Sequence, residues 1–169
     1  MTHHTATLGT RKTAVPFSDS VGTYGALSLL AAHCPLHSSF SAKLLNRLFL
    51  PAVEHEAVRI FRTSDNKPCG ALIWARLSDE VALRMFTENQ PPRANDWNSG
   101  DHLWFLDLLA PFGHGKDIAR HLVRNPPKEA FSFARLGPDK KLRKLIEVQR
   151  ESDAGRSFRS FFAEQDRPV

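Results

Sequence analysis

The strongest constraint on the fold is an apolar stretch over residues 101–111. Its large hydrophobic side chains are Leu103, Trp104, Phe105, Leu106, Leu108 and Leu109. A run of this length without strict alternation is typical of a β-strand that is buried on both faces. The turn Gly113-His114-Gly115 follows, and the sequence then predicts a helix over 116–123. The chain is therefore expected to build a covered sheet around this strand.

Weaker patterns before and after this strand predict the other elements. In chain order we expect a helix over 20–32, a helix from the N-cap Ser41 to Pro51, a hairpin of strands 57–62 and 70–77, a helix over 79–87, a loop over 90–100, strands over 129–136 and 142–148, and a short amphipathic helix at Phe158, Phe161 and Phe162. This order predicts an α+β, or mixed α/β, sheet flanked by helices.

Length and composition fit one globular domain. The chain has 169 residues, of which 41% are hydrophobic and 24% are charged. These values exclude a wholly disordered, collagenous or disulfide-scaffold protein. We divide the chain into a mobile N-terminal tail over 1–19, one domain over 20–150, and a C-terminal tail or short helix over 151–169.

The net charge of +5 is concentrated in the last third of the chain. Residues 1–113 contain ten basic and ten acidic side chains, whereas 114–169 contain thirteen and eight. A basic surface of this kind favours an acidic partner.

The two cysteines, Cys34 and Cys69, form no disulfide framework, and no apolar run reaches the ~18 residues of a membrane span. We expect a cytoplasmic protein without stable membrane insertion.

The segment Cys34-Pro35-Leu36-His37 places a thiol three residues before an imidazole. A thiol and a neutral imidazole within hydrogen-bond reach can act as nucleophile and base. The alternatives are a buried structural cysteine and an inert loop histidine. A metal site at His33 and His37 is not expected, because Pro35 breaks the helical spacing.

Two aspartates accompany the apolar strand, Asp101 at its start and Asp107 within it. An aspartate that enters a buried strand must be paired or hydrogen-bonded. Each is therefore either a structural capping residue or the partner of a histidine.

Two further features are compatible with binding sites. The turn at Gly113, Gly115 and Lys116 lies between a strand and a helix, where backbone N–H groups can receive a phosphate. Basic residues over 135–144 alternate with leucines, which indicates either the solvated face of an edge hairpin or a docking surface for an acidic partner. No aromatic residue interrupts 137–144, which argues against nucleic acid.

Several short motifs, in this order along the chain, resemble those of the RTX toxin-activating lysine acyltransferases, which convert hemolysin-type protoxins to active toxins. The matching segments are Pro35-Leu36-His37, Leu50-Pro51-Ala52, Trp74-Ala75-Arg76-Leu77-Ser78, Asp96-Trp97-Asn98-Ser99-Gly100-Asp101, Trp104-Phe105-Leu106-Asp107 and Ala110-Pro111-Phe112-Gly113. The resemblance covers about residues 24–148. It implies a fold like that of the Gcn5-related N-acetyltransferases (GNAT), whose mixed sheet is split to receive a pantetheine arm.

The resemblance also implies a function. Such an enzyme takes a fatty acyl group from acyl carrier protein and attaches it to internal lysine ε-amines of an RTX protoxin. The catalytic pair would be His37 as base and Asp101 as its orienting carboxylate, although an acyl group carried on His37 is an alternative. Cys34 stands where the family often has serine. Gly113, Gly115 and Lys116 would hold the pantetheine phosphate, and the basic C-terminal third would meet the carrier protein.

The resemblance further implies a homodimer and no tightly bound cofactor. Two other functions are also compatible with the sequence. One is a non-catalytic module that escorts a toxin or binds RNA. The other is a small-molecule N-acyltransferase that uses acyl-CoA on the same sheet.

Overall fold

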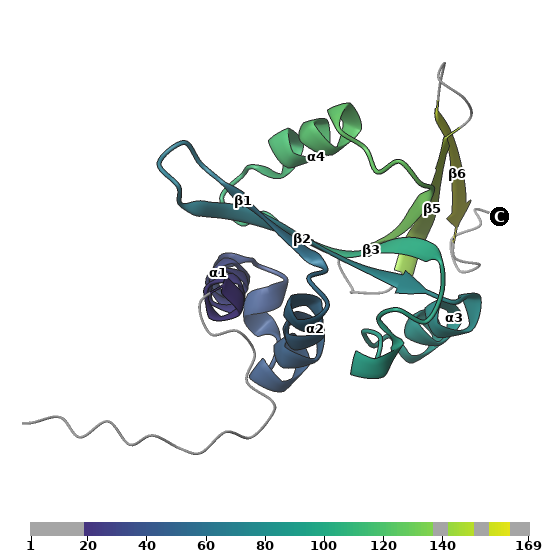
Figure 1. The fold of residues 1–169 in the computed structure, drawn as a ribbon, viewed down its shortest axis with the longest axis horizontal. Coiled ribbons are helices and arrows are strands. Elements are labelled where there is room, and N and C mark those ends of the chain that lie inside the picture. The colour runs from purple at the N-terminus through teal and green to yellow at the C-terminus, as the bar shows by residue number, and fades with distance from the viewer. Residues whose placement is uncertain (1–18, 137–141, 151–155, 163–169) are drawn as a thin grey trace, which may run out of the picture.

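A six-stranded sheet with helices on both faces organises the chain (Figure 1). The computed structural model describes residues 19–136, 142–150 and 156–162. The elements are α1 (Asp19–His33), the 3₁₀ helix η1 (His37–Ser39), α2 (Ala42–Glu54), β1 (Val58–Arg62), β2 (Pro68–Leu77), α3 (Asp79–Glu88), the 3₁₀ helix η2 (Ala94–Asp96), β3 (His102–Leu109), α4 (Gly115–Arg124), β4 (Phe131–Leu136), β5 (Leu142–Arg150) and β6 (Arg156–Phe162).

The strands lie in the sheet in the same order as in the chain, β1 to β6. Every neighbouring pair is antiparallel except β3 and β4, which are parallel. A parallel connection needs a crossover, and α4 supplies it between β3 and β4. The predicted α+β architecture with a mixed sheet is confirmed.

The sheet opens between its two parallel strands. Pairing between β3 and β4 covers Leu103 to Phe105 against Phe131 to Phe133, yet β3 continues to Leu109 and β4 to Leu136. The two strands therefore part beyond Phe105. This is the split sheet that the resemblance implied.

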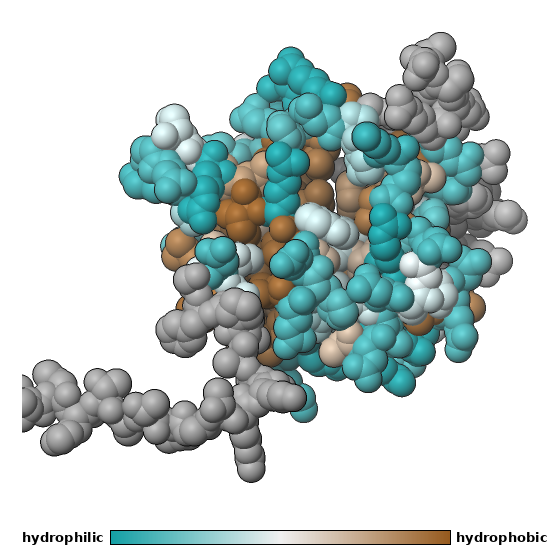
Figure 2. Space-filling model, viewed as in Figure 1, coloured by the Kyte–Doolittle hydropathy of each residue, from teal (hydrophilic) through white to brown (hydrophobic). Residues whose placement is uncertain are grey.

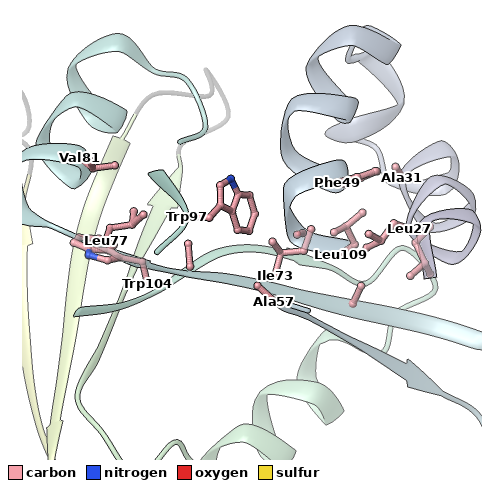
Figure 3. Packing of buried hydrophobic residues seen from close by; sticks show 14 of the residues in the cluster. Leu27, Ala31, Phe49, Ala57, Ile73, Leu77, Val81, Trp97, Trp104 and Leu109 are labelled. Carbon is pink, nitrogen blue, oxygen red and sulfur yellow. The ribbon is translucent and has the colours of Figure 1, made fainter. Parts of the chain in front are cut away.

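The helices divide between the two faces of the sheet. Figure 1 shows α1, α2 and α3 on one face and α4 on the other. The hydrophobic core cluster lies between the sheet and the first three helices (Figure 3), with Leu27, Phe49, Ile73, Trp97 and Leu109 fully buried. Hydrophilic residues cover much of the outside in the view of Figure 2. Among the described residues, no helix is long and apolar enough to cross a membrane.

On the opposite face, α4 packs tightly against β2 through Ile118. A Cβ atom added at Gly70 would lie 2.3 Å from Ile118 Cδ1. The same Cβ atom would lie 2.9 Å from the backbone carbonyl oxygen of Leu109, which cannot move aside as a side-chain methyl can, so a larger residue at position 70 would disturb the contact between Ile118 and the sheet. The contact holds the crossover helix against the sheet.

The predicted helix starts are confirmed, but the predicted end of α2 is wrong. The Ser41 hydroxyl accepts a hydrogen bond from the Leu44 amide, as an N-cap does. We expected Pro51 to end α2, whereas the helix continues to Glu54 with Pro51 buried inside it. Near a C-terminus, proline removes one hydrogen bond, while the last turn still gains packing against the sheet. The amides of His55 and Ala57 also donate to carbonyls of this turn.

The predicted helix at Phe158, Phe161 and Phe162 is also wrong, because these residues lie in β6. β6 pairs with β5 along seven residues, from Lys144 opposite Phe162 to Arg150 opposite Arg156. A helix of five residues is only marginally stable. A strand added to an open sheet edge instead satisfies the backbone hydrogen-bonding groups of both paired strands. β5 is consequently not an edge strand.

The predicted N-terminal tail over 1–19 lies almost wholly outside the described residues, which begin with Asp19, the first residue of α1. Residues 151–155 and 163–169 of the predicted C-terminal segment also lie outside them.

The packing of α2 leads to a stability prediction. We expect Phe49→Ala to lower the free energy of unfolding by about 3–5 kcal/mol, because it removes a fully buried ring. Its neighbour Leu50 is 46% exposed. Leu50→Ala should change the stability by less than about 0.5 kcal/mol. Urea unfolding of both variants measures the difference, and equal losses would contradict this account of the core.

Candidate active site

The segment after α1 is bent by Pro35, so that Cys34 and His37 lie on one tight turn. Proline cannot continue the helix, which ends at His33, and η1 begins four residues later. The Ser38 amide donates to the Cys34 carbonyl at 2.9 Å and closes the turn. Cys34 is half-buried, whereas the His37 side chain is only 3% exposed.

Both ring nitrogens of His37 have side-chain partners. Nε2 lies 2.6 Å from Oδ2 of Asp107, and Nδ1 lies 3.0 Å from Sγ of Cys34. The imidazole and the Phe40 ring are in T-shaped contact, with centroids 5.3 Å apart. A thiol, an imidazole and a carboxylate thus form a continuous row at the junction between α1, η1 and β3.

A β-bulge in β3 directs Asp107 toward His37. On β2, Ile73 and Ala75 are two residues apart and both belong to the core beneath the helices. Their partners on β3 are Asp107 and Trp104, which are three residues apart, and the register shifts between them. The extra residue reverses the alternation of β3, as bulges do. Asp107 therefore shares the helix-covered face with Trp104.

The expectation that Asp101 orients His37 is wrong. Asp101 precedes β3, and its backbone carbonyl accepts a hydrogen bond from Arg76. Asp101 lies six positions before Asp107 along an extended segment, which corresponds to about 20 Å. Asp107, which the sequence left as a capping residue or a histidine partner, provides the carboxylate. A lone acidic residue in an apolar strand was the signal for it, but the bulge that orients it has no sequence pattern of its own.

The contacts of His37 raise its pKa. Burial by itself lowers the pKa of the imidazole, but the hydrogen bond and negative charge of Asp107, with a smaller effect of Cys34, raise it to about 9. His37 is therefore an imidazolium at neutral pH, and each of its N–H groups donates to its partner. Because this pKa exceeds the ordinary value of 6.5, the stabilisation by the pair is complete below pH 6.5 and is lost as the pH rises through about 9.

His37 has the reverse effect on Cys34. Burial raises the pKa of this thiol, but hydrogen bonds from the His37 ring and from the amides of His37 and Leu36, together with the charge of His37, outweigh burial and lower it. Positive charge and N–H donors favour the thiolate, which is the reactive form of cysteine. The second cysteine, Cys69, is buried in β2.

An apolar cavity of about 440 Å³ opens beside His37 and Asp107. It lies between α2 and α3 over β3, and its apolar lining includes Leu44, Leu45, Leu48, Met85, Phe86 and Trp104. Leu106 of β3 and Ala134 of β4 also line it, so the cavity reaches the parting of the two parallel strands. No sequence pattern predicts this cavity, because its walls come from five separate elements, η1, α2, α3, β3 and β4.

The predicted phosphate-binding turn lies at the start of α4. Gly113 has a φ of +85°, which favours glycine, and α4 begins at Gly115 with Lys116 exposed after it. The ring of Phe112 contacts that of His33, with centroids 5.3 Å apart. This turn therefore adjoins the end of α1, one residue before Cys34.

Comparison with known proteins identifies the family. The model of the RTX toxin acyltransferase family matches residues 18–152. The chain is 31% identical over 132 residues to the RTX-III toxin-activating lysine-acyltransferase ApxIIC of Actinobacillus pleuropneumoniae, covering 78% of this chain and 76% of that protein. It is 32% identical over 123 residues to the protein-lysine myristoyltransferase HlyC of Escherichia coli, covering 73% and 70%. The chain belongs to the RTX toxin acyltransferase family and is an acyltransferase, which confirms the resemblance.

A solved structure with a partial likeness is that of the GNAT-like decarboxylase GphF in complex with isobutyryl-CoA. It aligns with a TM-score of 0.43 and 19% identity over 69% of this chain and 64% of that chain. The fold class of the present chain rests on its own sheet topology.

The row of three side chains leads to a prediction about titration. In Asp107→Asn the carboxylate charge is lost while burial remains, so we expect the pKa of His37 to fall by more than one unit from about 9. NMR titration of the imidazole carbon-bound protons measures this pKa. Asp101→Asn is the matched control and should leave it unchanged. An Asp107→Asn protein with the wild-type titration curve would refute the assigned pair.

Proposed function

We propose that this protein transfers a fatty acyl group from acyl carrier protein to internal lysine ε-amines of an RTX protoxin and thereby activates it. Its relatives are named as toxin-activating lysine acyltransferases and protein-lysine myristoyltransferases. The observation that carries the proposal is the apolar cavity, which has the His37–Asp107 pair in its wall. An acyltransferase for fatty chains needs such a combination of an apolar compartment and a proton-transfer group.

The cavity is suited to the hydrocarbon chain of the donor. Its volume lies within the range of about 300–1,000 Å³ that is usual for small-molecule sites. Burying an alkyl chain among leucine, methionine and aromatic side chains contributes roughly 0.8 kcal/mol for each methylene group. The carbonyl carbon at the polar end would then lie near His37 and Asp107.

His37 is the proposed base for the lysine. A lysine ammonium has a pKa of about 10.4 and cannot attack a thioester until it loses a proton. The pKa of His37, about 9, is closer to that of lysine than an ordinary imidazole's is, so proton transfer between them is less uphill. Asp107 orients the ring and stabilises its cationic form.

The donor would reach this site through the opened sheet. The pantetheine arm is proposed to pass between β3 and β4, whose separation beyond Phe105 adjoins the cavity. Its phosphate would bind at Gly113, Gly115 and Lys116, where the start of α4 presents backbone N–H groups. The basic C-terminal third favours an acidic carrier protein, and two free cysteines fit the reducing cytoplasm.

Replacing each aspartate tests the assignment of the carboxylate. We expect Asp107→Asn and His37→Ala to lower lysine acylation by roughly 10²–10⁴-fold, the usual contribution of a positioned acid–base pair. Asp101→Asn should retain at least ten times the activity of Asp107→Asn, because Asp101 is remote from the imidazole. Purified variants are compared with acyl carrier protein charged with a fatty acid, a protoxin fragment, and mass spectrometry of its lysines. Equal losses in the two aspartate variants would contradict the site.

Exchanging donors tests the route of delivery. With the same acyl chain, we expect kcat/KM for the acyl carrier protein to exceed that for the CoA thioester. Lys116→Glu should raise KM for the charged carrier protein and reduce the salt dependence of the rate, since it reverses a charge at the proposed phosphate site. A chain that prefers acyl-CoA and is insensitive to this substitution would favour a small-molecule N-acyltransferase instead.

A further inference from the structure

We propose that Cys34 is the first acceptor of the acyl group, so that transfer to lysine proceeds through a thioester on this enzyme. The inference rests on the proposed function, which supplies the thioester donor and the lysine. It gives a role to Cys34, the one member of the row of Cys34, His37 and Asp107 that a direct transfer to lysine would not use.

The geometry is that of an activated nucleophile. Sγ of Cys34 lies 3.0 Å from Nδ1 of His37, and the opposite nitrogen of the same ring lies 2.6 Å from Asp107. A nucleophile within hydrogen-bond reach of a base, with the base oriented by a carboxylate, is the arrangement used in covalent acyl transfer. The three groups come from two distant segments of the chain.

The charge state of the resting site also fits a cysteine nucleophile. With a pKa of about 9, His37 is mostly protonated at neutral pH. An imidazolium is unsuited to remove a proton at once. It is well suited to stabilise a thiolate, and the amides of Leu36 and His37 also donate to this sulfur.

Cys34 is placed where a thioester could reach it. Its side chain is half-buried rather than enclosed, unlike that of Cys69. Residue 33 contacts Phe112 of the turn that precedes α4, and residue 37 lines the apolar cavity. Cys34 therefore lies on a segment whose neighbouring residues contact the proposed phosphate-binding turn at one end and line the proposed acyl compartment at the other.

The first step balances without any additional reactant. The Cys34 thiolate attacks the carbonyl carbon of the donor thioester and forms a new C–S bond. The bond to the pantetheine sulfur breaks, and that sulfur takes the proton of the His37 imidazolium. The products are acyl-Cys34, the free pantetheine thiol and a neutral His37.

The second step restores the starting state. Neutral His37 removes one proton from the lysine ammonium, and the amine attacks the acyl-Cys34 carbonyl. The C–S bond breaks, the Cys34 thiolate leaves, and the second amine proton is released to solvent. Because Cys34 contributes to the raised pKa of His37, converting the thiolate to a neutral thioester lowers that pKa. The first step thus prepares the base that the second step needs.

The test isolates the first step by leaving the protoxin out. Wild-type enzyme is mixed with acyl carrier protein that carries a palmitoyl thioester, and free carrier thiol and intact enzyme mass are followed in time. We expect a burst of one thiol per active site and a matching acyl adduct on the Cys34 peptide, cleaved by neutral hydroxylamine. Cys69→Ala should behave like wild type. Cys34→Ala should show no burst and lose lysine acylation by at least about 10²-fold.

The other outcomes separate this inference from the proposed function. If wild type acylates protoxin lysines but shows no burst and no adduct, and Cys34→Ala retains the wild-type rate, the intermediate is refuted and the function stands. An adduct found on His37 in wild type also refutes it. If wild type acylates no lysine with any charged carrier, the proposed function itself fails. Unfolding curves of Cys34→Ala and Cys34→Ser verify that a lost activity is not a lost fold.

Discussion

The contact between His37 and Asp107 joins parts of the chain that are 70 residues apart. It ties the turn after α1 to the central strand and stands in the wall of the cavity. Burying two charges is costly unless each has a close partner, and here a 2.6 Å hydrogen bond supplies it. Removing Asp107 would leave one nitrogen of the buried imidazole without a partner, and removing His37 would leave the half-buried carboxylate without its cation. The same pair sets the pKa of the imidazole, so the stability of this junction and its chemistry have one source.

Two irregularities of the sheet make this contact possible. The bulge in β3 turns Asp107 to the helix-covered face, which it shares with Trp104. Regular alternation would have placed Asp107 on the other face of the sheet. The parting of β3 and β4 beyond Phe105 then leaves an opening next to the same carboxylate. A regular strand would have given better pairing and no site. In this protein the backbone pairing is interrupted at the place proposed for entry of the acyl donor.

Cys34 and His37 depend on each other through their charges. The imidazolium lowers the pKa of the thiol, and the sulfur in turn contributes to the raised pKa of the imidazole. In the proposed thioester mechanism, this pair gives a proton to the leaving sulfur and recovers one from the incoming amine. The three-residue spacing across Pro35 provides this coupling locally, whereas the carboxylate that orients it must come from the fold.

Most elements were determined by local sequence: the capping Ser41, apolar periodicity and turn residues predicted four helices, a hairpin, the central strand and the two strands that follow it. Periodicity failed at Phe158, Phe161 and Phe162, where pairing with β5 prevailed, and at Pro51, where packing extended α2. The sequence also placed Cys34 beside His37, since a tight turn keeps near neighbours together. Only the tertiary structure decided which aspartate meets the imidazole, because a one-residue bulge reverses the direction of a side chain and leaves no mark in the pattern of residues. The cavity was decided in the same way, since its walls come from elements that meet only after folding.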